Sequence, residues 1–305
     1  MHSVKYRSGL ASLRMAISRR LLDFILHGRD AAALPQHVLL PSDEVSSEML
    51  VAGIHEGQLL QPLFDHFLAA YKSRFANEIA LDVGANIGNH SLFFSRYFRT
   101  VLAVEPNPFT LHVLRANAAL SGADVRVLPM GFAEQDGLLR FFWNKRGNLG
   151  ASGFEFAGGP TNSENGQQIE CQVRRGDAVL NETLSGESSC RIGLIKLDVE
   201  GAELSALRGL ADSLVRDKPF VIFESLQAEG ESGGKAIFSF LREAGYVSFH
   251  AVESSVTSAR RSALGWLVRL FTGERVHLRR LEQPAAGEAY LMILAVPAGR
   301  ELGAE

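Results

Sequence analysis

The stretch that most constrains this 305-residue chain runs from Ala80 to Asn107. An apolar run ends at Asp82, a loop with two glycines follows, and an amphipathic segment leads to a second apolar run that ends at Glu105. A strand, a glycine loop, a helix and a second strand with a terminal acid form the first half of a nucleotide-binding α/β unit. The stretch therefore predicts a ligand site beside a sheet of parallel strands.

Two later apolar runs repeat this arrangement. Ile192–Leu197 is followed by an acid, and the run FVIFE also ends in one. Helical or turn-forming residues follow each run, and such alternation is typical of an α/β fold with a mostly parallel sheet. Since the carboxyl ends of parallel strands meet at one edge, we expect the four terminal acids to line one crevice. They are Asp82, Glu105, Asp198 and Glu224.

Composition and charge exclude several classes of protein. The formal net charge of −3 gives no reason to expect a nucleic-acid partner. Cys171 and Cys190 have no CxxC partner and no nearby histidine cluster. We therefore expect no structural zinc site and no disulfide framework, and we expect a reducing, cytoplasmic location. No apolar run reaches the roughly 18 residues that span a bilayer, so the chain is expected to be soluble.

The sequence divides into an expected helical extension, 1–53, and an expected domain, 54–305. Basic and apolar residues at near-helical spacing in the extension are compatible with peripheral membrane contact and with a solvated helix that caps the domain. Residues 144–168 form a glycine-rich loop, either a lid over a site or an inert insertion. Residues 254–287 are expected to form a basic helical insertion, for which membrane contact is again an alternative.

The glycine loop indicates which ligand binds beside it. From Gly84 it reads GANIG, which lacks the spacing of a dinucleotide fingerprint and disfavours a dehydrogenase. Asp82 would repel a pyrophosphate and attract an ammonium or sulfonium group. Glu105, seventeen residues past Gly88, suits two ribose hydroxyls. A ribose joined to a cationic amino-acid tail, without phosphate, describes S-adenosylmethionine. The alternative is that the glycines only allow close packing of strand and helix.

Four segments carry a resemblance to a known family: DVGANIGNHSLFF, AVEPNP, IKLDVEGAE and the strand ending in FE. Over about Ile54–Val252 the chain resembles the FkbM-type methyltransferases, a branch of the class I S-adenosylmethionine-dependent enzymes. The resemblance implies a Rossmann-like three-layer sandwich with a seven-stranded sheet, and methyl transfer to a hydroxyl of a sugar, polyketide or other small metabolite. Carried over, the methionine end would meet Asp82, Gly84, Asn86 and Gly88, the ribose Glu105 with Asn107 close by, and the adenine Met130 and Gly131.

Methyl transfer to an alcohol also needs a group that takes the hydroxyl proton. Asp198 is the first candidate for this base, Glu200 in the DVEG turn the second, and Glu224 the third. Glu200 could instead hold the turn, and Glu224 could bind a backbone amide. His90 is a weaker candidate, because at the start of its helix it could simply pack or cap.

Other ligands and partners follow less directly from the residues. Asp198 and Glu224 could share a divalent cation, but no third carboxylate is clearly placed, and no metal is predicted. His55 and Glu56 lie between glycines and could face a ligand, although such a pair more often belongs to a loop that leads into a helix. The expected partner is a small-molecule or glycan hydroxyl acceptor. A non-catalytic S-adenosylmethionine-binding or scaffold domain remains the alternative from another class.

Overall fold

A computed structural model describes residues 17, 20, 37–40, 44–144, 153–154, 166–187, 190–225, 233–254, 275–285 and 288–303. The chain divides into two compact units, Met1–His37 and Val38–Glu305, and every element below belongs to the second. The predicted N-terminal basic helix, most of the glycine-rich loop 144–168 and residues 255–274 of the predicted insertion lie outside the described residues. The boundary between residues 53 and 54 stays a prediction.

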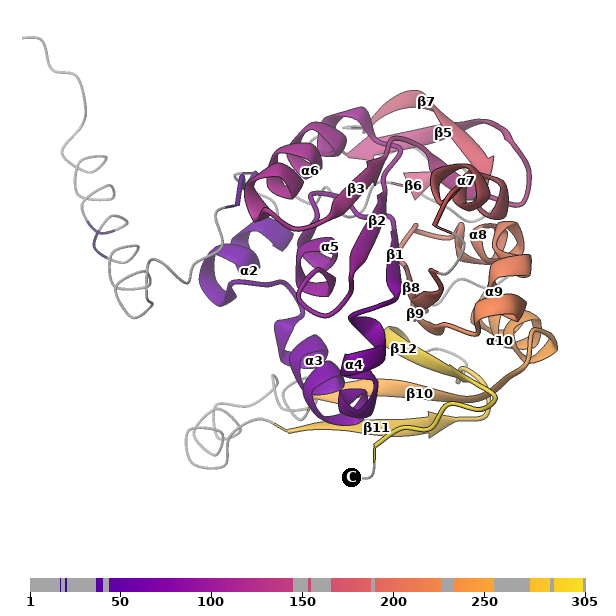
Figure 1. Cartoon of the computed structure of the whole chain (residues 1–305). Helices are drawn as coiled ribbons and strands as arrows, with labels where there is room; N and C mark the ends of the chain where they lie inside the picture. Colours follow the sequence, from indigo (N-terminus) through magenta and orange to yellow (C-terminus); the bar gives the residue numbers. More distant parts are fainter. Residues whose placement is uncertain are drawn as a thin grey trace, which may run out of the picture. The chain divides into compact units, whose positions relative to one another are not determined.

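The centre of the second unit is an eight-stranded sheet (Figure 1). Strands β9, β8, β1, β2 and β3 pair in parallel, whereas β12, β10 and β11 pair antiparallel. The predicted α/β fold with a mostly parallel sheet is therefore confirmed. In spatial order the strands are β11 (Val276–Leu281), β10 (Tyr246–Ser254), β12 (Tyr290–Pro297), β9 (Phe220–Ser225), β8 (Ile192–Leu197), β1 (Ile79–Val83), β2 (Thr100–Val104) and β3 (Val125–Leu128).

The expected count of seven strands is wrong by one, because β11 adds an edge strand. Its residues belong to the predicted helical insertion, yet they pair antiparallel with β10. The partly buried Val276 and Leu278 pack on an apolar cluster at the sheet, while Arg279 reaches an oxygen of Glu253 on β10 at 2.7 Å. The side chains thus follow the two-residue period of a strand. Over six residues that period is easily mistaken for a helical one.

The central strands β1, β2 and β8 are buried at every position, because helices cover both faces of the sheet. The predicted three-layer arrangement is thus confirmed. One face packs against α3 (Gly57–Pro62), a π-helical turn (Leu63–Phe67), a 3₁₀ turn (Ala69–Tyr71), α4 (Lys72–Phe75), α5 (Asn89–Phe94) and α6 (Pro108–Ser121). The other packs against α7 (Gly176–Thr183), α8 (Glu203–Gly209), α9 (Ala211–Asp217) and α10 (Gly234–Glu243).

Aromatic packing fixes α5, the helix that follows the glycine loop. The rings of Phe93 and Phe94 have their centroids 5.3 and 5.7 Å from that of Phe64, and all three side chains are buried. Such ring pairs contribute about 0.5–1.5 kcal/mol each beyond the burial of their area. These contacts hold the C-terminal end of α5, the helix whose N-terminus follows the glycine loop. Ahead of these elements, α2 (Glu44–Ala52) leads towards α3.

A second, four-stranded sheet follows β3 along the chain. Its order is β4 (Gly131–Ala133), β7 (Gly166–Arg175), β5 (Gly137–Asn144) and β6 (Gly153–Phe154). Strands β5 and β7 pair antiparallel at its centre. A small apolar cluster with Phe141, Cys171, Val173 and Ala202 joins this sheet to the residues that precede α8.

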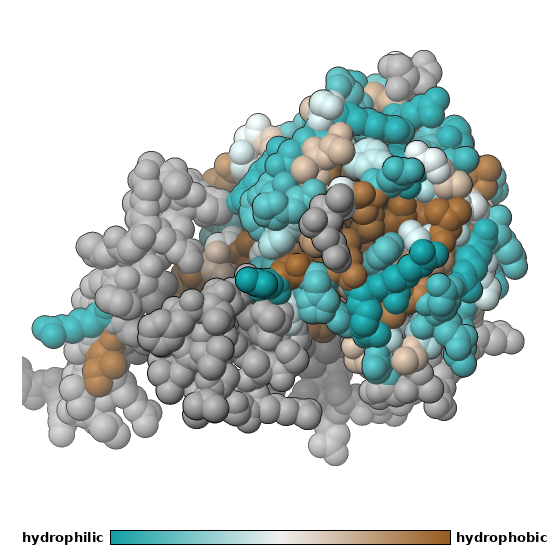
Figure 2. Space-filling view, turned by 90° about the horizontal axis from the view of Figure 1, so that it is seen from below, coloured by the Kyte–Doolittle hydropathy of each residue, from teal (hydrophilic) through white to brown (hydrophobic). Residues whose placement is uncertain are grey.

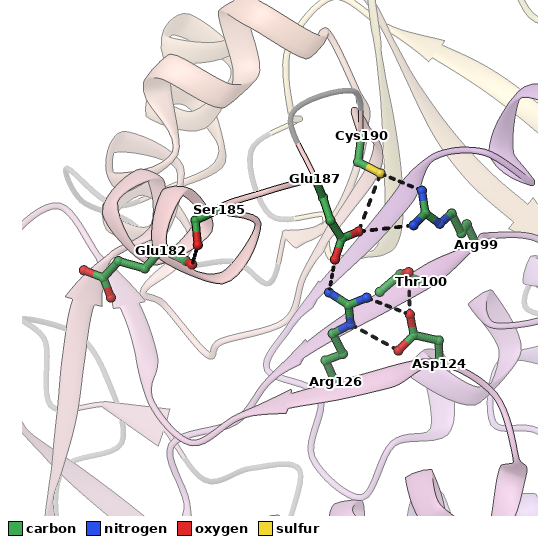
Figure 3. A network of polar contacts seen from close by, with 8 residues as sticks. All are labelled: Arg99, Thr100, Asp124, Arg126, Glu182, Ser185, Glu187 and Cys190. Carbon is green, nitrogen blue, oxygen red and sulfur yellow. Dashed lines mark hydrogen bonds and ion pairs between the residues drawn. The ribbon is translucent and has the colours of Figure 1, made fainter.

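An ionic network lies at the amino ends of β2, β3 and β8 (Figure 3). Arg126 contacts Asp124 at 3.0 Å and Glu187 at 2.7 Å. Arg99 donates to the Glu187 carboxylate at 3.4 Å and to Cys190 Sγ at 2.9 Å. Because these contacts join the segment before β8 to β2 and β3, they fix the amino-end edge of the sheet, which is opposite the edge that carries the strand-terminal acids.

Figure 2 shows from below the end of the molecule that carries α3, β10 and β11. Apolar residues gather in the middle of this face, and hydrophilic residues surround them. No helix among the described residues is both long and apolar enough to cross a membrane.

Candidate active site

The four predicted acids lie at the carboxyl ends of neighbouring strands. Asp82 is on β1 and Glu105 directly follows β2, while Asp198 directly follows β8 and Glu224 is on β9. These strands stand side by side in the order β9, β8, β1, β2 and run in parallel. The structure therefore brings the four side chains to one edge of the sheet, as the positions of the strand ends predict. Their individual roles stay predictions.

The glycine loop after β1 is shaped by contact with β8. Gly84 has φ +85°, and a Cβ on it would lie 1.8 Å from the carbonyl oxygen of Asp198. Gly88 has φ +95°, and its Cβ would meet the side chain of Leu114 at 2.9 Å. Both positions thus need glycine for backbone reasons alone, which is what the packing alternative expects. The loop nevertheless leaves polar groups without partners.

Asp82 is a buried carboxylate with one free oxygen. The side chain is 0% exposed, and its Oδ2 accepts a hydrogen bond from the Ser91 hydroxyl at 2.6 Å. Its Oδ1, and the Oδ1 of Asn86 in the loop, are buried and have no hydrogen-bond partner among the described residues. Asn86 is also held at φ +51°, an uncommon conformation for a residue other than glycine. Buried acceptors without donors are costly, so this loop is suited to a ligand that donates hydrogen bonds.

Glu105 anchors the other side of the loop. Its carboxylate oxygens accept hydrogen bonds from the backbone N–H groups of Asn86 and Asn107, both at 2.8 Å. Burial raises the pKa of Glu105 to about 7, although these hydrogen bonds act in the opposite direction. Each carboxylate oxygen still has a lone pair for a ligand hydroxyl.

Three further residues predicted to hold the cofactor, Asn107, Met130 and Gly131, follow the ends of β2 and β3. Asn107 caps α6, because its side-chain oxygen accepts from Phe109 N at 3.0 Å. That oxygen is therefore engaged within the protein. The half-buried Met130 packs on the main core, and Gly131 begins β4 next to it. The end of β3 lies next to Glu105, because the backbone N–H of Glu105 donates to the carbonyl oxygen of Leu128 at 3.1 Å.

Lys196 is a site residue that the sequence analysis missed. It lies on β8 in register with Asp82 on β1, is 4% exposed, and places Nζ 2.9 Å from Asp198 Oδ2. Burial lowers the pKa of Lys196, but the charges of Asp198 and Asp82 outweigh it and raise the pKa above its ordinary value. Burial likewise raises the pKa of Asp198, and the charge and hydrogen bond of Lys196 lower it further than burial raises it. Asp198 is therefore an ionised, paired carboxylate.

The turn after β8 is held by Glu203 and not by Glu200. Glu203 Oε1 accepts from Val199 N at 3.3 Å and from Gly201 N at 3.1 Å. Glu200 has φ +49°, and its side chain makes no hydrogen bond with the described residues. Burial, with the charges of Asp198 and Glu203, raises the pKa of Glu200 to about 7. The suggestion that Glu200 holds the turn is therefore wrong.

Like Glu200, Glu224 has a side chain that makes no hydrogen bond with the described part of the chain. The suggestion that it binds a backbone amide is therefore also wrong. Burial raises the pKa of Glu224 to about 8, together with the charges of Asp198 and Glu56, while Lys196 acts in the opposite direction. Glu224 therefore carries a proton much of the time near neutral pH.

A second group of side chains reaches the same edge from the segment before α3. Glu56 Oε2 lies 3.1 Å from His90 Nε2, and the two side chains are 14% and 10% exposed. His55 contacts Glu48 through Nδ1, and its backbone N–H donates to Asn89 Oδ1 at 2.9 Å. The segment does lead into a helix, since Glu56 occupies the N-cap position of α3. It also places the Glu56 carboxylate against the His90 ring.

The residues that the structure describes contain no group of three or more His, Cys, Asp or Glu side chains that could hold a metal ion.

Comparison with known proteins identifies one family and several relatives. Residues 82–248 match the family model described as "Methyltransferase FkbM domain". Methyltransferase sdnD of Sordaria araneosa is 32% identical over 181 residues, which are 51% of this chain and 69% of that protein. The 31-O-demethyl-FK506 methyltransferase FkbM of Streptomyces tacrolimicus is 28% identical over 219 residues, 61% and 82% of the two chains.

A further relative is the hexuronic acid methyltransferase AglP of Haloferax volcanii, which is 30% identical over 154 residues, 48% of this chain and 56% of that protein. The segment that matches the family model contains the glycine loop, Glu105 and the turn after β8. His55 and Glu56 lie ahead of it in the sequence.

Proposed function

This chain belongs to the methyltransferase FkbM domain family, and from that premise we propose that it is an S-adenosylmethionine-dependent O-methyltransferase acting on a hydroxyl of a sugar, glycan or small metabolite. The observation that carries the proposal is the pair of buried, unpartnered oxygens, Asp82 Oδ1 and Asn86 Oδ1, beside a loop of close backbone contacts. A carboxylate oxygen at 0% exposure is stabilised by a cationic donor far more than by a neutral one.

The residues around the loop fit the parts of S-adenosylmethionine. Asp82 and Asn86 would accept from its ammonium group, and Glu105 from its ribose hydroxyls. Met130 and Gly131 would lie at the adenine. Gly84, Gly88 and Asn107 would give the loop and the start of α6 their shape. When bound, the sulfonium supplies an electrophilic methyl group, so the protein's task is to align the acceptor oxygen and receive its proton.

The acceptor side of the site is proposed at β8 and β9. Asp198, Glu200 and Glu224 face the same edge as the glycine loop, and carboxylates accept hydrogen bonds from hydroxyl groups. The printed names of two relatives, a 31-O-demethyl-FK506 methyltransferase and a hexuronic acid methyltransferase, support a hydroxylated small molecule or glycan. A nucleic-acid acceptor is not expected, and peripheral membrane contact through the basic N-terminal segment remains a separate proposal.

Two measurements on the full chain test the proposal. Calorimetry should detect binding of S-adenosylhomocysteine and none of a nicotinamide dinucleotide, and Asp82→Ala should abolish the former. Incubation with S-adenosylmethionine labelled in its methyl group and a panel of sugars, glycans and hydroxylated metabolites should transfer label to at least one of them. Dinucleotide binding in place of S-adenosylhomocysteine would favour a dehydrogenase. Binding without transfer to any hydroxyl acceptor would favour a non-catalytic domain.

A further inference from the structure

The side chain that takes the proton of the acceptor hydroxyl must lie in the site and must also be kept in a fixed orientation. A base that acts on a nucleophile is usually oriented by a third group, which keeps its lone pair aimed at the proton it takes. Glu200 and Glu224 do not meet that condition, because neither is held by a hydrogen bond within the described residues. Asp198 is held by Lys196, but the charge and hydrogen bond of Lys196 outweigh the effect of burial and lower the pKa of Asp198, which makes it a weaker base.

His90 does meet that condition. Its Nε2 lies 3.1 Å from Glu56 Oε2, and its ring stacks on Phe94 of the same helix with a centroid separation of 6.2 Å and an interplanar angle of 24°. Phe94 is itself fixed in the aromatic core. The second ring nitrogen, Nδ1, makes no hydrogen bond with any described residue. The ring is therefore held on one side and has a nitrogen available on the other.

The position of His90 follows from the glycine loop. Gly88 ends the loop and His90 is the second residue of α5, so the ring stands next to the proposed cofactor site. The neighbouring Ser91 binds Asp82 on β1, which places this turn of α5 beside the carboxyl end of that strand. A proton gained by His90 would lie beside the Glu56 carboxylate.

We propose that His90, oriented by Glu56, takes the proton of the acceptor hydroxyl during methyl transfer. The inference rests on the proposed function and adds the path of the proton. The acceptor oxygen attacks the methyl carbon, the carbon–sulfur bond breaks with its electron pair going to sulfur, and the O–H proton passes to His90 Nδ1. The products are the methyl ether, S-adenosylhomocysteine and a protonated His90. Glu56 is a positioning residue, and its carboxylate stabilises the positive charge that the ring acquires.

The test compares the full chain with His90→Gln, His90→Ala and Glu56→Gln, using an acceptor that wild-type protein methylates in the panel. His66→Gln is the matched control, because His66 is exposed on a neighbouring helical turn. We expect His90→Gln to lower kcat by about 100-fold or more, with KM and the affinity for S-adenosylhomocysteine within threefold of wild type. Imidazole in the buffer should restore part of the activity of His90→Ala. Glu56→Gln should lower kcat by about tenfold with KM unchanged, while His66→Gln changes neither kcat nor KM.

Each outcome decides the proposal. A His90→Gln protein that binds S-adenosylhomocysteine normally and retains more than a third of the wild-type kcat would overturn it. So would a Glu56→Gln protein with the wild-type kcat, which decides the matter if the His90 variants fail to fold. If the wild-type chain methylates no acceptor, the proposed function itself fails and the proton path with it, an outcome that differs visibly from the loss of activity in the variants alone.

Discussion

The ammonium of Lys196 lies 2.9 Å from the carboxylate of Asp198, so the carboxylate with the most obvious position for a base already has a cationic partner. The Lys196 side chain is almost completely enclosed, with 5% exposed, whereas that of Asp198 is 36% exposed. The pair therefore combines a buried cation with an anion that still faces the site. Its role is to keep a negative charge at this point of the edge.

Replacing Lys196 by Met should destabilise the protein and weaken its activity. The substitution leaves Asp198 and Asp82 without their shared cation, and we expect a loss of about 1–3 kcal/mol at pH 7, below the value for a fully buried pair because water can reach Asp198. The folded-state pKa of Asp198 is depressed, so the pair stabilises above the ordinary value of 3.8 and its contribution is lost as pH falls through the folded pKa. Urea denaturation measures the change.

The matched control for that experiment is Lys72→Met. Lys72 forms an ion pair with Asp65 at 2.6 Å, but its side chain is 44% exposed. Such surface pairs contribute about 0–1 kcal/mol. If Lys196→Met and Lys72→Met lowered the free energy of unfolding equally, the buried cation would be no more important for stability than an exposed one.

Asp82→Asn should weaken binding of S-adenosylhomocysteine by about 10- to 100-fold, because a charge-assisted hydrogen bond to its ammonium is replaced by a neutral one. Binding of 5′-methylthioadenosine, which has no ammonium group, should change little. Ser91→Ala, which removes the hydrogen bond to Asp82 and keeps the carboxylate, is the control and should have a smaller effect. Equal weakening for both ligands in calorimetry would show that Asp82 does not face the amino-acid end.

Glu105 should make the protein less stable as pH rises towards neutral. Its folded-state pKa is about 7 against an ordinary value of 4.5, so the folded protein binds the proton more tightly than the unfolded chain. The resulting stabilisation is complete below pH 4.5 and is lost as pH rises through 7. Between pH 5 and 8 the free energy of unfolding of wild type should fall by about 2–3 kcal/mol more than that of Glu105→Gln. Parallel stability curves for the two proteins would disprove this.

Gly84→Ala should damage the fold more than a glycine substitution elsewhere. The new Cβ would overlap the Asp198 carbonyl at 1.8 Å and sit at φ +85°, so the strand ends must move apart, and we expect a loss above about 3 kcal/mol. Gly122→Ala is the control, since it has φ +66° but nothing within 4 Å of the added carbon. It should lose only about 1–2 kcal/mol from the backbone conformation. Similar midpoints of urea unfolding for Gly84→Ala and Gly122→Ala would refute the close contact between Gly84 and Asp198.

Local patterns explain what the sequence predicts well. The unit from β1 to β2 is recognisable because apolar runs, glycines and strand-terminal acids are all signals of short range. Parallel pairing then places Asp82, Glu105, Asp198 and Glu224 at one edge without further information.

The features that the sequence does not predict depend on contacts between residues far apart in the chain. Lys196 lies within an apolar run and reveals its role only through its register with Asp82 across two strands. Glu56 and His90 are 34 residues apart, and nothing in either segment indicates the other. The choice between Glu200 and Glu203 depends on which carboxylate reaches the backbone N–H groups of the turn, and composition does not determine that. A two-residue period over a short segment is equally ambiguous, as β11 shows.

The contact between Gly84 and Asp198 joins the loop proposed for the cofactor to the turn proposed for the acceptor, backbone against backbone. Neither segment can shift without moving the other, so a ligand that reorders one changes the free energy of binding at the other. Such coupling is reciprocal. An acceptor should therefore alter the affinity of the protein for S-adenosylhomocysteine, and a library of hydroxylated compounds can be sorted by equilibrium binding before a single turnover is observed.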